Sequence, residues 1–321
     1  MMKRAIILLF VSLTFVTCAS KPAAVSAQET NTAAFKTHVN KHAIIPESPR
    51  PGDPITIGVN SSEKEVQLIV DGKQVSKSKF FTVPAEGKNP GFRAAILAVP
   101  TGTRAGSAIL KMTNDWNAVY EVEITISPRE FQSQTLNFSA EVSSLVNDPN
   151  PERTKEAEIL WAIWNTTGNQ IYHTGPFALP TTATRRTSPF GFRRTNIYTD
   201  GKRTSSVHAG VDFGIPTGTE VYACGRGKVA LSRPRILSGG SVVIEHAPGV
   251  YSMYYHLDKV IALENTIVET GALIGLSGAT GMVTGPHLHW ELRISAEYAD
   301  PDVLVARPLI DKRLIISKIF D

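Results

Sequence analysis

The sequence predicts a mainly β protein in which two β modules are joined by a short helical linker. Short runs rich in β-branched and aromatic residues alternate with turn signals along most of the chain, a pattern typical of half-buried strands. One helix is predicted over about residues 150–165, where Asn150 can cap the first turn and Pro151 occupies its first position. A length of 321 residues is enough for two domains.

The first 27 residues predict an export signal. Lys3 and Arg4 precede an uncharged apolar run over residues 5–17, which as a helix would be about 20 Å long, short of the roughly 30 Å hydrocarbon core of a membrane. Small residues follow and allow cleavage after Ala27. Cys18 offers an alternative, a lipoprotein acylation site that would anchor the protein, but a threonine directly before it disfavours this hypothesis.

Charge and cysteine content exclude some classes of protein. Removal of residues 1–27 would leave 30 basic and 29 acidic residues, so no basic surface for nucleic acid is expected. Cys224 would be the only cysteine left, which excludes an internal disulfide. It lies in the strand-like stretch TEVYACGRG, where we expect a buried packing residue.

The distribution of strand-like runs and turns along the chain predicts its domain organisation. We expect an immunoglobulin-like β-sandwich over residues 43–127, where five strand-like runs are separated by turns. No cluster of His, Cys or acids at ligand spacing occurs there, so it is interpreted as a spacer or docking module. Trp161 and Trp164 of the linker helix are expected to pack against the domain that follows. The other predicted parts are a signal peptide at 1–27, a flexible tether at 28–42, a linker at 128–180, a second antiparallel β domain at 181–305 and a C-terminal tail at 306–321.

Two histidines lie one residue apart in TGPHLHWEL. In a strand, His287 and His289 project to the same face, whereas in a helix they would diverge. Two neighbouring imidazoles would repel if both were charged, and unpartnered ring nitrogens are costly to bury. A metal ion would resolve both difficulties for at least one of the pair.

Further ligands are predicted in SSVHAGVDFG. His208 and Asp212 are four residues apart, with Gly210 between them allowing a close turn. Two histidines and one carboxylate form a three-ligand set, which suits a catalytic zinc with its fourth position open to water. Satisfied core histidines are the alternative. His256 ends YSMYYHL, the expected second arm of a hairpin whose first arm is SVVIEH, and strand alternation predicts that Tyr254 faces the same way as His256.

The motifs SPFGFR, HAGVDF, YYHL and TGPHLHWE, in this order, resemble those of the LytM or lysostaphin-type zinc metalloendopeptidases, which cut peptide bonds in peptidoglycan. The resemblance covers about residues 175–305 and implies the duplicated-hybrid-motif fold of these enzymes. It also implies that His208, Asp212 and His289 bind one zinc ion and that His256 and His287 form the catalytic pair beside it.

The resemblance implies an exported zinc-dependent endopeptidase of the periplasm or cell envelope, which hydrolyses peptide cross-links of bacterial peptidoglycan through a metal-activated water. Tyr254 and Arg193 are candidates for the substrate groove. The β-sandwich is a candidate site for an envelope partner. Two alternatives remain open: a catalytically silent activator of another wall hydrolase, and a wall-binding envelope protein.

Overall fold

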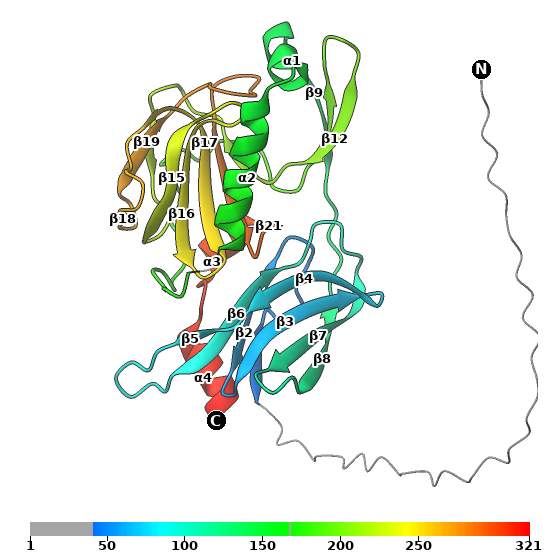
Figure 1. Ribbon diagram of the computed structural model, residues 1–321, viewed down its shortest axis with the longest axis vertical. Helices are drawn as coiled ribbons and strands as arrows, with labels where there is room; N and C mark the ends of the chain where they lie inside the picture. Colours follow the sequence, from blue (N-terminus) through cyan, green and yellow to red (C-terminus); the bar gives the residue numbers. More distant parts are fainter. Residues whose placement is uncertain (1–40, 167) are drawn as a thin grey trace, which may run out of the picture. The chain divides into compact units, whose positions relative to one another are not determined.

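Strands dominate the computed structural model, which describes residues 41–166 and 168–321 (Figure 1). The predicted mainly β class is therefore confirmed. The predicted signal peptide, Cys18 and all but the last two residues of the predicted tether lie outside the described residues. Among the helices of the described part, none combines the length and the apolar character needed to span a membrane.

The N-terminal module consists of two four-stranded sheets that share one core. One sheet has the order β1 (His42–Ile45), β2 (Pro54–Val59), β6 (Phe92–Ala98), β5 (Phe81–Val83), and the other has the order β4 (Lys73–Lys79), β3 (Glu63–Val70), β7 (Gly106–Asn114), β8 (Val119–Ile126). Alternate side chains of both sheets, such as Ile57 and Leu68, are fully buried in one hydrophobic cluster. Two sheets packed in this way form a β-sandwich, whose immunoglobulin-like type remains a prediction.

The linker contributes a strand and two helices. These are β9 (Ser133–Asn137), α1 (Ala140–Asn147) and α2 (Pro151–Asn165). The side chain of Asn150 accepts a hydrogen bond from the Glu152 N–H and so caps α2. β9 pairs in parallel with β11 (Arg193–Ile197), which also pairs with β12 (Arg203–Val207), so the linker is built into a three-stranded sheet of the second module.

Helix α2 packs through one face, and this corrects part of the sequence prediction. Helix α2 lies against the strands β15, β16 and β17 (Figure 1). Leu160 is buried there, and Trp164 packs against the same cluster. Trp161, which was expected to pack there too, is 65% exposed. Residues 160 and 164 are one turn apart and define the buried stripe, whereas residue 161 is turned about 100° away from it.

The second module is built on an antiparallel sheet. Its main order is β10 (Arg186–Ser188), β13 (Gly210–Phe213), β20 (Leu288–Ile294), β17 (Val250–Val260), β16 (Gly239–Ala247), β15 (Gly227–Arg235), β18 (Ile267–Val268). β14 (Glu220–Tyr222) pairs with β19 (Leu273–Ser277), which also pairs with β17, and β21 (Glu297–Ala299) pairs with β20. β16 and β17 form the predicted hairpin, and Cys224 is fully buried as expected.

The segment predicted as a C-terminal tail over residues 306–321 contains a helix that packs on the rest of the protein. α3 (Pro301–Ala306) is followed by α4 (Lys312–Phe320), whose Ile315 and Ile319 are buried. A Cβ atom on Gly58 of β2 would lie only 2.3 Å from Ile315 Cγ2, which shows how closely α4 approaches the N-terminal module. The apolar spacing of KRLIISKIF buries one face of the helix, and this burial gives the segment its fixed place.

Candidate metal centre

Strand register places two of the three predicted ligands opposite each other. β13 pairs with β20 so that Asp212 lies across from His289, and directly opposed side chains in a sheet are close enough to share a ligand. This pairing depends on Gly210, because a Cβ atom there would lie 2.1 Å from the Trp290 carbonyl oxygen. Gly210 therefore allows the close backbone approach that brings the two side chains together.

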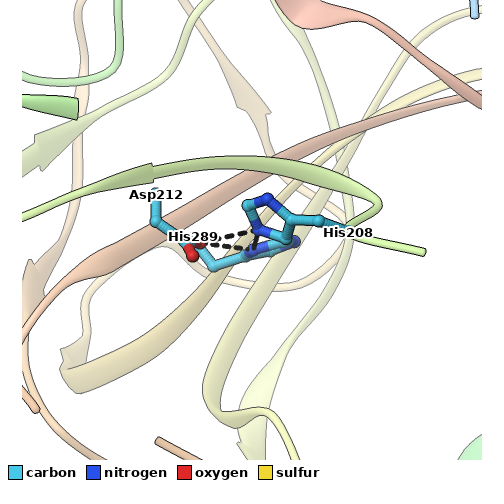
Figure 2. A group of neighbouring side chains, drawn as sticks. All are labelled: His208, Asp212 and His289. Carbon is cyan, nitrogen blue, oxygen red and sulfur yellow. Dashed lines mark hydrogen bonds and ion pairs between the residues drawn. The ribbon is translucent and has the colours of Figure 1, made fainter. Parts of the chain in front are cut away.

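The third side chain comes from the loop between β12 and β13. His208 Nε2 lies 3.0 Å from Asp212 Oδ1 and 3.1 Å from His289 Nδ1, and Asp212 Oδ1 lies 2.8 Å from His289 Nδ1 (Figure 2). One donor atom from each residue lies within 4.8 Å of the others. The structure therefore brings together the three residues that the sequence predicts as metal ligands.

Each of these side chains has a partner on the side away from the cluster. His208 Nδ1 lies 2.7 Å from the Pro189 carbonyl oxygen, and His289 Nε2 lies 3.4 Å from Glu291 Oε2. An N–H at each of these outer positions donates to oxygen, so each ring, when neutral, directs its unprotonated nitrogen to the cluster. Metal-ligating histidines need this tautomer, so the donor set fits a metal ion.

The electrostatics of the cluster also favour a cation. Burial opposes ionisation of Asp212, but hydrogen bonds and charge from His208 and His289 outweigh it and hold the pKa of this carboxyl well below its usual range. Burial lowers the pKa of His289, yet hydrogen bonds to Asp212 and Glu291 prevail and raise it to about 9. Two carboxylates therefore stabilise positive charge at this point, which a metal ion would supply.

His256 and His287 lie beside the cluster, as predicted. Their ring centroids are 4.7 Å apart, and His287 Nε2 is 3.8 Å from Asp212 Oδ1. His256 Nδ1 lies 2.8 Å from the Thr280 carbonyl oxygen, and His287 Nδ1 lies 2.8 Å from that of Gly285. An N–H at each Nδ1 donates to these carbonyls, which leaves each Nε2 as a proton acceptor. Burial and the charges of His287 and His289 lower the pKa of His256 to about 3, so it is neutral near pH 7.

Tyr254 does not face the site, contrary to the strand-alternation prediction. It is fully buried in the core, and its hydroxyl accepts a hydrogen bond from the Cys224 N–H. The register between β16 and β17 shifts after Tyr254, and His256 adopts a φ of 64°, in the left-handed region. This irregularity lets Tyr255 and His256 project to the same side. Tyr255 stacks on His289 with 5.6 Å between ring centroids.

Arg193 is likewise outside the cleft. Its guanidinium donates to the carbonyl and hydroxyl oxygens of Thr101 and lies over the Phe131 ring. The adjacent Arg194 lies in the cleft where Arg193 was expected. Arg194 Nη2 donates to Asp212 Oδ2 over 2.8 Å. Adjacent residues of a strand face opposite sides, and the sequence carried no signal that would choose between them.

The cluster lies in a cavity of about 690 Å³. Its lining comes from β9, β11, β12, α2 and the loop at residues 282–287, together with the predicted site. Glu291 and Tyr255 were not predicted as site residues. Strand alternation after His289 was the available signal for Glu291, because residues 287, 289 and 291 share a face.

A buried pair of histidines and a carboxylate, with two more histidines in the same cleft of a β-rich module, defines a candidate hydrolytic metal centre. Residues 206–301 match the model of Peptidase family M23, and this part of the chain is a domain of that family. The family predicted from the motifs is thereby confirmed for this region.

Two curated relatives each align with part of the chain. DD-carboxypeptidase/endopeptidase Mpg of Neisseria meningitidis is 38% identical over 142 residues, which is 44% of this chain and 32% of Mpg. Peptidoglycan DD-endopeptidase ShyA of Vibrio cholerae is 47% identical over 85 residues, which is 26% of this chain and 20% of ShyA. The matched segment thus spans about a third or less of these relatives.

A solved structure shares the fold over most of the chain. The crystal structure of a Pseudomonas aeruginosa protein assigned to peptidase M23 matches 80% of this chain and 94% of its own, with a TM-score of 0.57 and 21% sequence identity. At this identity the likeness concerns the fold alone, and it includes more than the domain matched by the family model.

Proposed function

We propose that this protein is an exported zinc-dependent endopeptidase that hydrolyses peptide cross-links of bacterial peptidoglycan. The convergence of His208, Asp212 and His289 beside two further histidines in one cleft carries the proposal. Such a set provides both a place for a metal ion and groups that can move protons.

Zinc is the proposed metal because of the donor set. Two imidazole nitrogens and one carboxylate oxygen suit zinc, and catalytic zinc sites with three protein ligands keep a position for water or substrate. When bound, zinc lowers the pKa of water towards about 7 and polarises the scissile carbonyl. In our proposal His208, Asp212 and His289 hold this ion, one per peptidase domain.

His256 and His287 are the proposed catalytic pair. Each ring is oriented by a carbonyl at Nδ1 and has Nε2 available towards the cleft. One of them accepts the proton of the attacking water, while the other stabilises the oxyanion or protonates the leaving amine. Because burial lowers the pKa of His256 and its N–H at Nδ1 donates to Thr280, its Nε2 enters the reaction as an acceptor, and it can donate to an oxyanion or amine only after gaining a proton.

Peptidoglycan stem peptides are the proposed substrate. The names of the relatives Mpg and ShyA describe DD-endopeptidases, and cross-links between D-alanine and a diamino acid are the common target in a bacterial envelope. The N-terminal module would dock onto the wall or an envelope partner, and the site of action would be the periplasm or cell envelope. Membrane association would follow only if Cys18 is lipidated.

The completeness of the site favours an enzyme over a silent activator. All five predicted side chains are present, and the three candidate ligands each have an oriented outer contact. A protein that acts only by docking would not require this arrangement.

A release assay tests the proposal. Purified peptidoglycan is incubated with wild type, His287→Ala and the control His42→Ala, which removes an imidazole from the N-terminal module. With zinc, wild type and the control should release soluble peptides, whereas His287→Ala should release at least ~100-fold less, the usual contribution of a general acid or base. Chelation should abolish release.

Equal release by wild type and His287→Ala would contradict the enzyme proposal and favour an activator or binding protein. The same products after chelation would contradict metal dependence while leaving a hydrolase. Mass spectrometry of the released muropeptides then identifies the bond that is cut.

A further inference from the structure

The two oxygens of Asp212 have separate partners. Oδ1 faces His208 Nε2 and His289 Nδ1, where the ion is proposed to bind. Oδ2 accepts a hydrogen bond from Arg194 Nη2 over 2.8 Å. Only Oδ1 is therefore directed at the proposed ion.

Arg194 is itself held in place. Its Nε donates to Gln134 Oε1 over 3.1 Å, and its Nη2 also donates to Ser188 Oγ over 2.9 Å. The side chains of Arg194 and Asp212 are only 18% and 9% exposed, so water competes little with the pair. Gln134, Ser188 and Arg194 come from β9, β10 and β11, all before the first residue matched by the family model.

We propose that Arg194 is a positioning residue that keeps Asp212 a one-oxygen ligand and so preserves an open coordination position on the metal. Carboxylates can bind metals through one oxygen or through both. With Oδ2 engaged by a fixed guanidinium, the second oxygen cannot turn towards the ion. This inference rests on the proposed metal site, and its outcome is measured on metal binding rather than on hydrolysis.

The identity of the side chain matters as well as its charge. A guanidinium is planar and offers several donors in fixed directions, so Arg194 reaches Asp212, Ser188 and Gln134 together. A lysine ammonium at this position keeps the charge but lacks the fork. We therefore expect Arg194→Lys to differ from wild type in metal binding, whereas a purely electrostatic role predicts no difference.

The test compares wild type, Arg194→Met and Arg194→Lys with the control Arg203→Met, which removes an exposed guanidinium from the same three-stranded sheet. Zinc affinity is measured by competition with a chromophoric chelator, and coordination is read from the visible spectrum of the cobalt-substituted proteins.

We expect zinc to bind Arg194→Met about 10–100-fold more weakly than wild type. We also expect its cobalt absorption to weaken, as the coordination number rises. Arg194→Lys should be intermediate in affinity with an altered spectrum, and Arg203→Met should match wild type.

An unchanged zinc affinity and cobalt spectrum in Arg194→Met would overturn the inference. If Arg194→Met fails to fold, as thermal unfolding of the chelated protein would reveal, Arg194→Lys decides: wild-type affinity and spectrum in that variant overturn it, and altered values support it. A wild type that binds zinc but releases no peptides would contradict the proposed function while leaving this inference standing.

Discussion

Among single residues, the candidate site depends on the backbone geometry at two positions. Gly210 permits the approach of β13 to β20, and the left-handed conformation of His256 turns that ring into the cleft. A non-glycine residue in this conformation is strained, and such strain is often found at functional sites. The chemistry of the cluster is thus set by local backbone geometry as much as by the ligating side chains.

We expect Gly210→Ala to destabilise the protein by about 1–3 kcal/mol or more, because its Cβ would meet the Trp290 carbonyl oxygen at 2.1 Å. Displacement of β13 should also weaken zinc binding. Gly102→Ala is the matched control, since nothing lies within 4 Å of a Cβ there. Denaturant unfolding of both variants measures the difference, and equal stabilities would show that the strands tolerate the extra atom.

At the scale of elements, helix α2 connects to the candidate site although it lies outside the matched family region. Trp164 stacks on the Arg293 guanidinium, which lies 4.1 Å from the ring centroid, and Arg293 Nε donates to Glu291 Oε1. Glu291 is also the outer partner of His289. A linker helix thus supports a candidate metal ligand through two intervening side chains.

Two tryptophans of α2 provide a matched pair for testing this support. Trp164→Ala should destabilise the protein by about 1–3 kcal/mol, because it removes a partly buried ring and the contact of that ring with Arg293. The loss should be smaller than for removal of a fully buried tryptophan side chain. Trp161→Ala should change stability by no more than about 0.5 kcal/mol, because Trp161 is 65% exposed. Equal losses in denaturant unfolding would contradict the packing described for α2.

At the scale of the whole described structure, the two modules are joined through a common apolar cluster. The cluster contains Phe81 and Ile96 from the N-terminal module, Trp290 and Leu292 from the second, and Ile315 from α4. An ion pair between Arg129 and Asp300 and a hydrogen bond from Thr56 Oγ1 to the Leu309 carbonyl oxygen add polar contacts. We therefore expect the modules to unfold together.

Removal of α4 packing tests this cooperativity. Ile315→Ala should lower the free energy of unfolding by about 2–5 kcal/mol, because the side chain is fully buried. Its neighbour Leu314 is 39% exposed, so Leu314→Ala should have a clearly smaller effect. Calorimetry should show one shifted transition for Ile315→Ala. Two separate transitions, with only the first shifted, would show that the modules unfold independently.

Patterns of neighbouring residues were enough to predict which side chains carry the candidate chemistry. The predictions relied on short-range patterns: the spacing of His208 and Asp212, the HLH pair and the order of the motifs. Such patterns can be recognised from the sequence without a structure. The mainly β class follows from the same short-range periodicity. The structure then brought His208, Asp212, His256, His287 and His289 into one cleft.

The neighbours that complete the site, in contrast, depend on contacts between segments far apart in the chain. Strand alternation predicted that Tyr254 faces the site, but the register shift in β17 directs Tyr255 towards His289 instead. The motif drew attention to Arg193, but the pairing of β11 with β9 and β12 directs Arg194 to Asp212. Bulges and strand phase result from contacts between segments far apart in the chain, and a single sequence does not record the energies of those contacts.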